Sequence, residues 1–359
     1  MTVGTQNLHT RVGAVTVHRG HFRIERGYDS SVRVPDVVMQ CVAFVGEVTG
    51  RDSSGAVEGD LHATGFFVSI PLGDGGEPPS LVYFVTARHV ATDLKNREVY
   101  FLVNKVGGGV TTIPHFGTRW YLHPTDKTAD VAVIPVGNPG DADIKAVHIN
   151  NLGMPSLLSA LDIGIGDEVF ATGLFTPVAG SARNEPIVRY GNIAMMPQEQ
   201  IQTELGYADV YLVEARSIGG LSGCPVFVRP SIRLPQESKN PHTKNVWAVG
   251  HGAILLGMMH GHWDIKESDL NKTYISHDRK HGVNLGIGIV VPAQKIWETI
   301  RRPELQEMRI KLKKQLDRES VPGMDSARPK SDKETPFTQQ DFEGALKKAS
   351  RKIASAPKK

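Results

Sequence analysis

Short apolar runs bounded by turn residues dominate the chain from residue 36 to about residue 297. The runs are rich in β-branched and aromatic side chains, and Gly, Pro, Asn and Asp separate them, which predicts strands rather than helices. The first group is VVMQCVAFVGEV (37–48), ATGFFVSI (63–70), LVYFVTA (81–87), EVYFLVN (98–104) and VAVIPV (131–136). The second group is DEVFATG (167–173), PIVRYGNIAMM (186–196), DVYLVEA (209–215), CPVFV (224–228), VWAVGHGAILLGMM (246–259) and GIGIVV (286–291). Many short strands without alternating long helices predict two β units, each a sandwich or a barrel.

The pattern becomes helical after Pro292. The segment AQKIWETIRR has apolar residues at helical spacing, and PELQEMRIKLKKQLDRES opens with Pro303, which suits a first helical turn. Residues 320–336 are rich in Pro, Ser, Lys and Asp and have the composition of a linker. Beyond them, Thr338 and Asp341 predict a capping-box-like start to a short basic amphipathic helix.

These patterns divide the chain into six parts. The parts are an N-terminal segment (1–36), a first β unit (37–137), an inter-unit linker (138–165), a second β unit (166–297), a C-terminal helix (298–319) and a basic, flexible tail (320–359). Residues 301–359 carry 16 Lys and Arg against 9 Asp and Glu, so the basic character lies at the C-terminal end.

Composition restricts the class of protein. The 359 residues are 40% hydrophobic and 22% charged, which is enough for packed cores, and the net charge of only +3 argues against nucleic-acid binding by the whole molecule. The N-terminus lacks the apolar core of a secretion signal, and no apolar run approaches the roughly 20 residues of a membrane helix. Two cysteines, Cys41 and Cys224, are too few for a disulfide framework and favour a reducing compartment over the alternative of a bridge between them. We therefore expect a soluble, cytoplasmic protein with no membrane span.

The stretch SIGGLSGCPVF (217–227) places Ser222 between glycines. Alone, it is typical of a turn between strands. A serine becomes a nucleophile when a base removes its proton and a third group orients the base. His89 in YFVTARHVATDL closes an apolar strand, and Asp130 in PTDKTADVAVIPV opens one. Each alone has an ordinary reading, His89 as a core or surface histidine and Asp130 as a cap.

Together, TA-x-H-V, D-V-A-V-I and G-x-S-G-x-P in this order resemble the trypsin-like serine peptidases, over roughly residues 37–303. The resemblance implies an all-β fold of two six-stranded antiparallel β-barrels with a C-terminal helix. It implies that Ser222 attacks the scissile carbonyl, that His89 takes and returns its proton, and that Asp130 orients the imidazole. It also implies an oxyanion hole formed by the backbone N–H groups of Gly220 and Ser222.

The sequence departs from the family pattern in three places. Leu221 stands where the secreted digestive members have an aspartate that receives the newly cut N-terminus, so that activation ion pair is excluded. Cys224 replaces a glycine found in many relatives and is expected to pack as a small apolar residue. Val90 stands beside the predicted catalytic histidine where relatives often have a cysteine, which is consistent with intracellular life.

By position in the family, Arg216 lies at the base of the substrate-binding pocket, and His260 and Gly261 lie near its wall. Positive groups there favour an acidic side chain before the scissile bond; the alternative is that Arg216 points to solvent. A competing hypothesis is a zinc site of His260, His262, His251 and Asp264. Histidines two apart on an exposed strand need no metal, so we expect no metal and no cofactor.

These expectations amount to a cytoplasmic serine endopeptidase that hydrolyses protein or peptide substrates through an acyl-enzyme. The alternative is a catalytically silent trypsin-like protein that binds peptides or serves as a scaffold. The tail GALKKASRKIASAPKK is a basic segment that could bind a partner protein, an anionic surface or nucleic acid. The alternative is that it is a solvated extension without a binding role.

Overall fold

A computed structural model describes residues 17–18, 21–22, 34, 36–53, 55, 57–72, 80–115, 119–137, 141–175, 180, 183–203, 205–215, 220–229, 253–265 and 283–319. The chain divides into two compact units, Met1–Pro35 and Asp36–Lys359. In the first unit, the described residues form β1 (Val17–His18) and β2 (His21–Phe22), which pair antiparallel. The candidate site lies entirely in the second unit. The predicted linker at 320–336 and the predicted tail helix lie outside the described residues.

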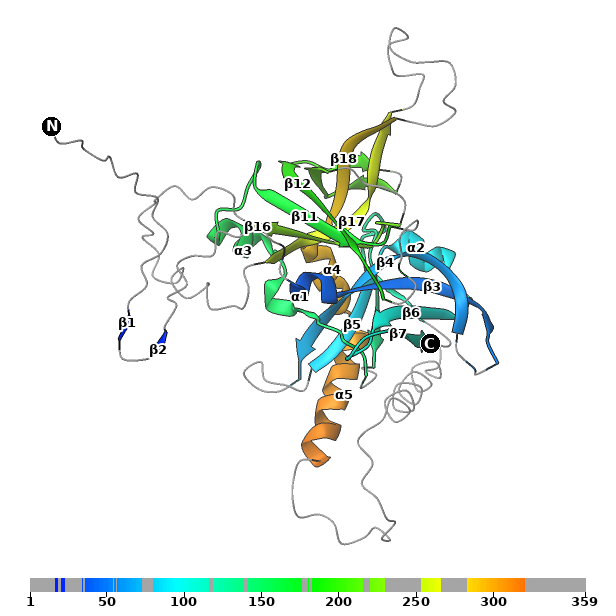
Figure 1. The fold of residues 1–359 in the computed structure, drawn as a ribbon. Helices are drawn as coiled ribbons and strands as arrows, with labels where there is room; N and C mark the ends of the chain where they lie inside the picture. The colour runs from blue at the N-terminus through cyan, green and yellow to red at the C-terminus, as the bar shows by residue number, and fades with distance from the viewer. Residues whose placement is uncertain are drawn as a thin grey trace, which may run out of the picture. The chain divides into compact units, whose positions relative to one another are not determined.

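The first half of the larger unit is a sheet of eight strands (Figure 1). Seven follow the order β7-β6-β3-β4-β5-β9-β8, and the eighth, β10, pairs parallel with β4. In chain order the strands are β3 (Val42–Arg51), β4 (Val57–Pro71), β5 (Ser80–Thr86), β6 (Val99–Asn104), β7 (Val110–His115), β8 (Tyr121–Leu122), β9 (Ala132–Val136) and β10 (Val147–His148). Its core consists of apolar side chains from strands that are nearly continuous apolar runs, such as β5 and β9.

The prediction of two six-stranded barrels is confirmed for the second half only. Among the strands that the structure describes, β7 pairs with β6 alone and β8 with β9 alone, so the two ends of the sheet do not join there. The physical reason lies in the last strand, because β8 is two residues long and cannot offer a ladder to a further neighbour. Within the described residues this sheet is therefore open.

The second half is a closed barrel in the order β11-β12-β15-β18-β17-β16. Its strands are β11 (Glu168–Gly173), β12 (Ile187–Met195), β15 (Tyr211–Glu214), β16 (Pro225–Arg229), β17 (Ile254–Ile265) and β18 (Val283–Pro292). Every adjacent pair is antiparallel, and the barrel interior includes Val213, Val226 and Val290. A hairpin of β13 (Ile201–Thr203) and β14 (Gly206–Ala208) stands outside the barrel order.

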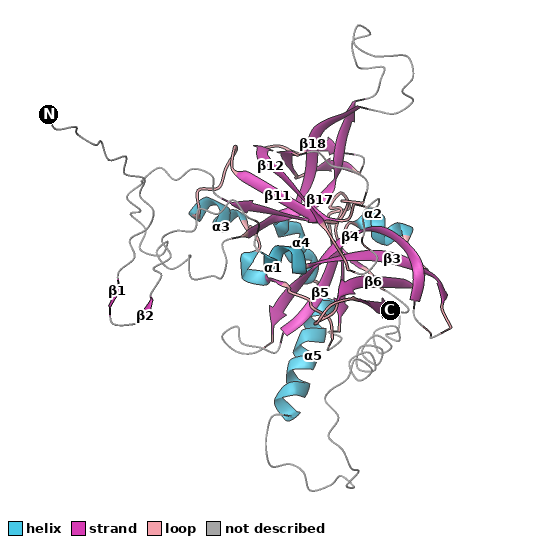
Figure 2. Cartoon of the chain, in the orientation of Figure 1, coloured by secondary structure: helices cyan, strands magenta, loops and turns pink. Residues whose placement is uncertain are grey.

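Among the described residues helices are fewer than strands, and all but the last of them are at most eight residues long (Figure 2). They are α1 (Asp36–Gln40), α2 (Arg88–Asp93), the 3-10 turn η2 (Ile149–Asn151), α3 (Pro155–Ala160), α4 (Ala293–Ile300) and α5 (Pro303–Glu319). A helical C-terminus is confirmed, but as two helices, since Arg301 ends α4 and Pro303 begins α5. Helix α1 also replaces the first residues of the strand expected at 37–48. None of the described helices is long and apolar enough to cross a membrane.

Thr64 of β4 joins the sheet to the barrel and is fully buried. Its hydroxyl donates to the Gly220 carbonyl at 2.7 Å and accepts from the Leu174 N–H at 2.8 Å, while its own N–H donates to the Ser222 carbonyl at 3.2 Å. Gly223 fits beside it with a φ of +83°, and a Cβ there would lie 2.2 Å from the Thr64 carbonyl oxygen. Only glycine tolerates both conditions, so the loop containing Ser222 is seated directly against β4.

Candidate active site

Asp130 precedes β9 in a loop that is organised by another aspartate, Asp126. Asp126 Oδ1 accepts hydrogen bonds from the N–H and hydroxyl of Thr128 and from the N–H of Ala129, at 2.7 to 3.2 Å. Its Oδ2 accepts from Lys295 of α4 at 2.7 Å. The loop then turns inward, and Asp130 is 1% exposed. A carboxylate so deeply buried requires hydrogen-bond donors around it.

His89 lies in the first turn of α2, three residues after β5 ends at Thr86. Ala87 is extended and breaks the strand, and the helix starts at Arg88. The His89 N–H donates to Asp130 Oδ1 at 2.9 Å, and its Nδ1 lies 2.8 Å from Asp130 Oδ2. Strands β5 and β9 are neighbours with Thr86 opposite Ala132, so the pairing of two strands brings these side chains together.

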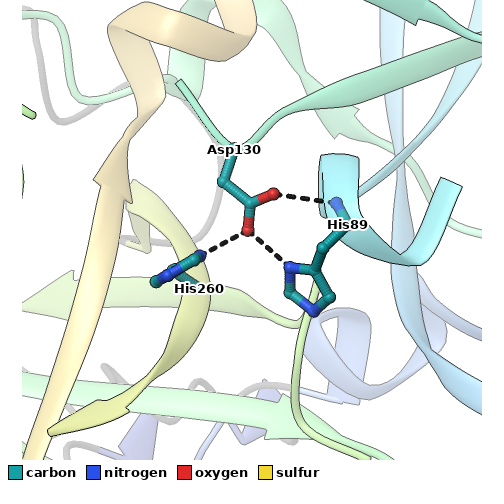
Figure 3. Close-up of side chains that lie close together, drawn as sticks. All are labelled: His89, Asp130 and His260. Carbon is teal, nitrogen blue, oxygen red and sulfur yellow. Dashed lines mark hydrogen bonds and ion pairs between the residues drawn. The ribbon is translucent and has the colours of Figure 1, made fainter. Parts of the chain in front are cut away.

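His260 of β17 contacts the same carboxylate oxygen as His89 (Figure 3). Its Nδ1 lies 2.5 Å from Asp130 Oδ2, and its side chain is 12% exposed, against 38% for His89. The two imidazole rings stand edge to face with centroids 5.7 Å apart. An ionised carboxylate only accepts hydrogen bonds, so both Nδ1 atoms carry hydrogen. The lone pair of a neutral His89 ring is then at Nε2.

Asp130 is held in its charged form. Burial alone would raise the pKa of Asp130, but the hydrogen bonds from His260 and His89 outweigh burial and keep that pKa well below its ordinary value. The site therefore carries a fixed negative charge at neutral pH. Such a charge favours a neighbouring imidazolium and fixes the ring tautomer.

Ser222 lies on the other side of His260. Its Oγ donates to the His260 carbonyl oxygen at 3.3 Å, a long hydrogen bond. In the described part of the chain, no hydrogen bond joins this hydroxyl to the imidazole of His89. The structure thus brings His89 and Asp130 into direct contact and links Ser222 to them through His260.

Gly220 and Ser222 present backbone amides near the hydroxyl. Thr64 holds both of their carbonyl oxygens, and Gly220 has a φ of +93°, which favours glycine. Within the described residues, neither amide N–H donates to a protein acceptor.

The residues that depart from the family pattern are buried. Leu221 and Cys224 are fully buried and belong to the barrel core. Both cysteines are free, so the alternative of a Cys41–Cys224 bridge is not formed. Burial raises the pKa of the Cys41 thiol to about 12 and also raises that of Cys224. At these pKa values neither thiol is a nucleophile at neutral pH.

The structure describes only one side chain of the predicted zinc set, that of His260, and so does not test that set. His251 lies outside the described residues, as do the side chains of His262 and Asp264. His260 instead joins His89 and Asp130 in a group whose potential ligand atoms lie within 4.8 Å of one another. Zinc bonds of about 2.0–2.1 Å in a tetrahedron hold ligand atoms about 3.3 Å apart. The separations of 2.8 and 2.5 Å are those of hydrogen bonds instead.

The structure describes two of the three predicted substrate-binding residues, His260 and Gly261 of β17. Arg216 lies outside the described residues. Gly261 lies at a register shift between β17 and β18, with nothing within 4 Å of where a Cβ would stand. His260 turns its ring to Asp130, a contact that sequence reasoning missed. The sequence does carry a signal for it, because His260 follows an apolar strand segment just as His89 does.

No family model and no curated protein matches the chain. Among solved structures, the chain is similar to the MamO protease domain from Magnetospirillum magneticum in its apo form, at 16% identity and a TM-score of 0.43. That match covers 74% of this chain and 98% of the other. It is also similar to Deg5, at 14% identity and a TM-score of 0.36, over 63% of this chain and 81% of Deg5. These two matches assign no role to any residue of this chain.

Proposed function

We propose that the protein is a serine endopeptidase in which Ser222 is the nucleophile, His89 the general base and Asp130 the group that orients the base. The observation that carries the proposal is the double contact between His89 and Asp130, through the His89 N–H and its Nδ1. This contact fixes the position of the ring and leaves Nε2 as the basic atom. A base with a defined tautomer beside a buried carboxylate is what activates a serine.

The reaction follows from these positions. Ser222 Oγ leaves the His260 carbonyl by rotation about its side-chain bond and gives its proton to His89 Nε2 as it bonds to the scissile carbonyl carbon. The oxygen of that carbonyl becomes an oxyanion, which the amides of Gly220 and Ser222 stabilise. When the C–N bond breaks, His89 donates the proton to the leaving amine. A water molecule, deprotonated by His89, then hydrolyses the acyl-enzyme and restores the serine.

Substrate preference is also part of the proposal. A protein or peptide segment in extended form suits the site, and no cofactor is needed for the steps above. The preference for an acidic residue before the scissile bond now depends on Arg216, because the imidazole of His260 is bound to Asp130. We propose a cytoplasmic location, and a basic tail that binds a partner protein or an anionic surface.

A fluorophosphonate probe tests the nucleophile. The wild-type protein is expected to gain one phosphonyl group by mass, and Ser222→Ala is expected to gain none while melting within a few degrees of wild type. The matched control is Ser156→Ala, at an exposed serine of α3, which should label fully. Equal labelling of Ser222→Ala and wild type would refute the assignment.

A silent peptide-binding protein is the second candidate, and the hydrogen bond from Ser222 Oγ to the His260 carbonyl favours it. In such a protein the hydroxyl would stay on the carbonyl when a peptide binds. Wild type would then bind peptides but show neither probe labelling nor cleavage of a peptide library between pH 6 and 9. Cleavage that Ser222→Ala abolishes would exclude this candidate.

A further inference from the structure

Asp130 accepts hydrogen bonds from two imidazole rings, whereas the proposed mechanism needs a carboxylate for one ring, that of His89. Its Oδ1 accepts from the His89 N–H, and its Oδ2 accepts from both ring Nδ1 atoms (Figure 3). A carboxylate has about four lone-pair sites, so three donors can be accommodated. The hydrogen bonds can therefore all form, but the carboxylate has only one negative charge to balance a proton on either ring.

We propose that His260 is a positioning residue and proton sensor, which orients Asp130 when neutral and switches off the base when protonated. This inference rests on the proposed function, since it concerns regulation of the same site. The His260 side chain makes the contact with Asp130, and its carbonyl holds the resting Ser222 hydroxyl. One residue therefore contacts both the group that orients the base and the nucleophile.

The charge balance explains the switch. With both rings neutral, the proton that His89 takes from Ser222 gives a +1 ring beside a −1 carboxylate, and the cluster becomes neutral. If His260 already carries a proton, the cluster is neutral beforehand, and the same transfer leaves a net positive charge in a largely buried site. For charges 5.7 Å apart and an effective dielectric constant of about 20, the repulsion disfavours the second imidazolium on the order of a hundredfold.

Among the described side chains, the charged or titratable groups that contact the His260 ring are Asp130 and His89. The hydroxyl of Ser222, which precedes β16, donates to the His260 carbonyl, and the adjacent Gly261 pairs with Ile289 of β18. Helix α4 also packs on β17, but its charged residues are paired elsewhere, Lys295 with Asp126 and Asp209, and Glu298 with His123. The side chains of 262–265, on the same strand, are outside the described part.

Two substitutions separate the orienting role from the proton-sensing role. Asparagine places an amide N–H near the position of Nδ1 and cannot be protonated, so His260→Asn keeps a donor to Asp130. Leucine fills a similar volume without a donor, so His260→Leu leaves the carboxylate with one imidazole. A buried carboxylate that loses a hydrogen bond becomes less well oriented. The matched control is His62→Asn, a partly exposed histidine of β4 that lies 3.6 Å from Glu47.

The pH dependence of kcat/KM on a cleaved peptide tests the sensor. In wild type, a proton on either ring blocks the base, whereas in His260→Asn only a proton on His89 does. The acid limb of His260→Asn should therefore move to lower pH, and the shift equals about 0.3 units when the two rings have equal proton affinity, the statistical factor of two for equivalent sites. His260→Leu should lose at least tenfold in kcat with KM changed less than threefold, and His62→Asn should match wild type.

A spectroscopic measurement keeps the test independent of turnover. In Ser222→Ala, proton NMR should show two low-field Nδ1–H signals, and Ser222→Ala with His260→Asn should show one. If wild type neither labels with the probe nor cleaves peptides, the proposed function fails, and the two signals still decide whether both rings donate to Asp130. If the enzyme is active but the acid limbs of wild type and His260→Asn coincide, or only one low-field signal exists in Ser222→Ala, the inference is overturned. Should His260→Leu not fold, as judged by circular dichroism, the His260→Asn profile decides alone.

Discussion

The open sheet and the closed barrel each contribute a pair of site residues, but they fix them differently. His89 follows β5 and Asp130 precedes β9, and these paired strands bring the two side chains into contact through a backbone N–H and a ring nitrogen. Ser222 precedes β16 and His260 lies in β17, which are also paired, yet they meet only through a 3.3 Å hydrogen bond to a backbone carbonyl. The proposed base, His89, is thus preorganised within the sheet, whereas the proposed nucleophile, Ser222, is not preorganised within the barrel.

The barrel residues are instead positioned by contacts that cross to the sheet. The carbonyls of Gly220 and Ser222 are held by Thr64 of β4, and the imidazole of His260 is held by Asp130. The contacts that position the proposed nucleophile, Ser222, therefore lie at the junction of the two β units. Three substitutions, taken from the largest expected effect to the smallest, test this difference.

Asp130→Asn should remove the preorganisation of the base. The single oxygen of an amide cannot accept all three hydrogen bonds that Asp130 accepts, and the amide nitrogen donates instead. His89 is therefore expected to change tautomer and carry its hydrogen at Nε2. By analogy with the same change in the Ser-His-Asp template, kcat/KM should fall about 10⁴-fold. Steady-state cleavage of a peptide substrate measures the loss.

The control for this change is Asp141→Asn, at a half-exposed residue that pairs with Lys105 on the surface. It should retain wild-type activity. A loss smaller than tenfold for Asp130→Asn would mean that the base works without its carboxylate, and the contrast between sheet and barrel would disappear.

Thr64→Val should weaken the junction itself. Valine keeps the shape of threonine but leaves the buried Leu174 N–H without its acceptor and the Gly220 carbonyl without its donor. Each unsatisfied buried group costs about 1–3 kcal/mol, so the loss of both should lower the free energy of unfolding by roughly 2–6 kcal/mol, and kcat should fall because the proposed oxyanion donors lose their support. Urea unfolding and peptide cleavage measure the two effects.

Serine restores the hydroxyl at this position, so Thr64→Ser is the matched control and should recover most of both quantities. Wild-type cleavage by Thr64→Val would show that the Ser222 loop holds its own conformation. The nucleophile would then be as independent of the other unit as the base is.

The sequence predicted the contact within the sheet more completely than the contacts at the junction. The meeting of His89 and Asp130 follows from two apolar runs, at 81–87 and 131–136, whose ends carry the polar residues and which pair as neighbours. Ser222 is indicated by the glycines on both sides of it in SIGGLSGCPVF. Thr64 has no such signal, because a threonine inside a strand looks like any other β-branched residue.

The sequence did not predict the contact of His260 with Asp130 or the open form of the first sheet. The direction in which His260 points depends on the register of β17 against β16 and β18, and that register contains shifts between 259 and 261 and between 262 and 264. A one-residue shift reverses the face of a strand, so residue order cannot decide where the ring goes. Barrel closure likewise depends on whether the terminal strands are long enough to pair, which the two-residue β8 prevents.

Lys295→Met gives the smallest expected effect and tests whether the sheet half also relies on the C-terminal helix. Lys295 holds Asp126, whose other oxygen organises the loop that presents Asp130. Burial would raise the pKa of Asp126, but the hydrogen bonds from Lys295 and Thr128 keep it well below its ordinary value of 3.8. Since the folded state lowers this pKa, the contribution of Asp126 to stability is present above about pH 4 and is lost as the pH falls further.

In Lys295→Met that contribution should shrink, so the drop in melting temperature between pH 7 and pH 3 should be smaller than in wild type. The kcat should fall only a few-fold, because Thr128 and Ala129 still hold the loop. Lys295→Arg keeps the positive charge and should restore the wild-type pH dependence of melting. If Lys295→Met melts with the wild-type pH dependence but loses activity as strongly as Asp130→Asn, α4 acts on the base by a route other than Asp126, and the sheet half is no more self-contained than the barrel half.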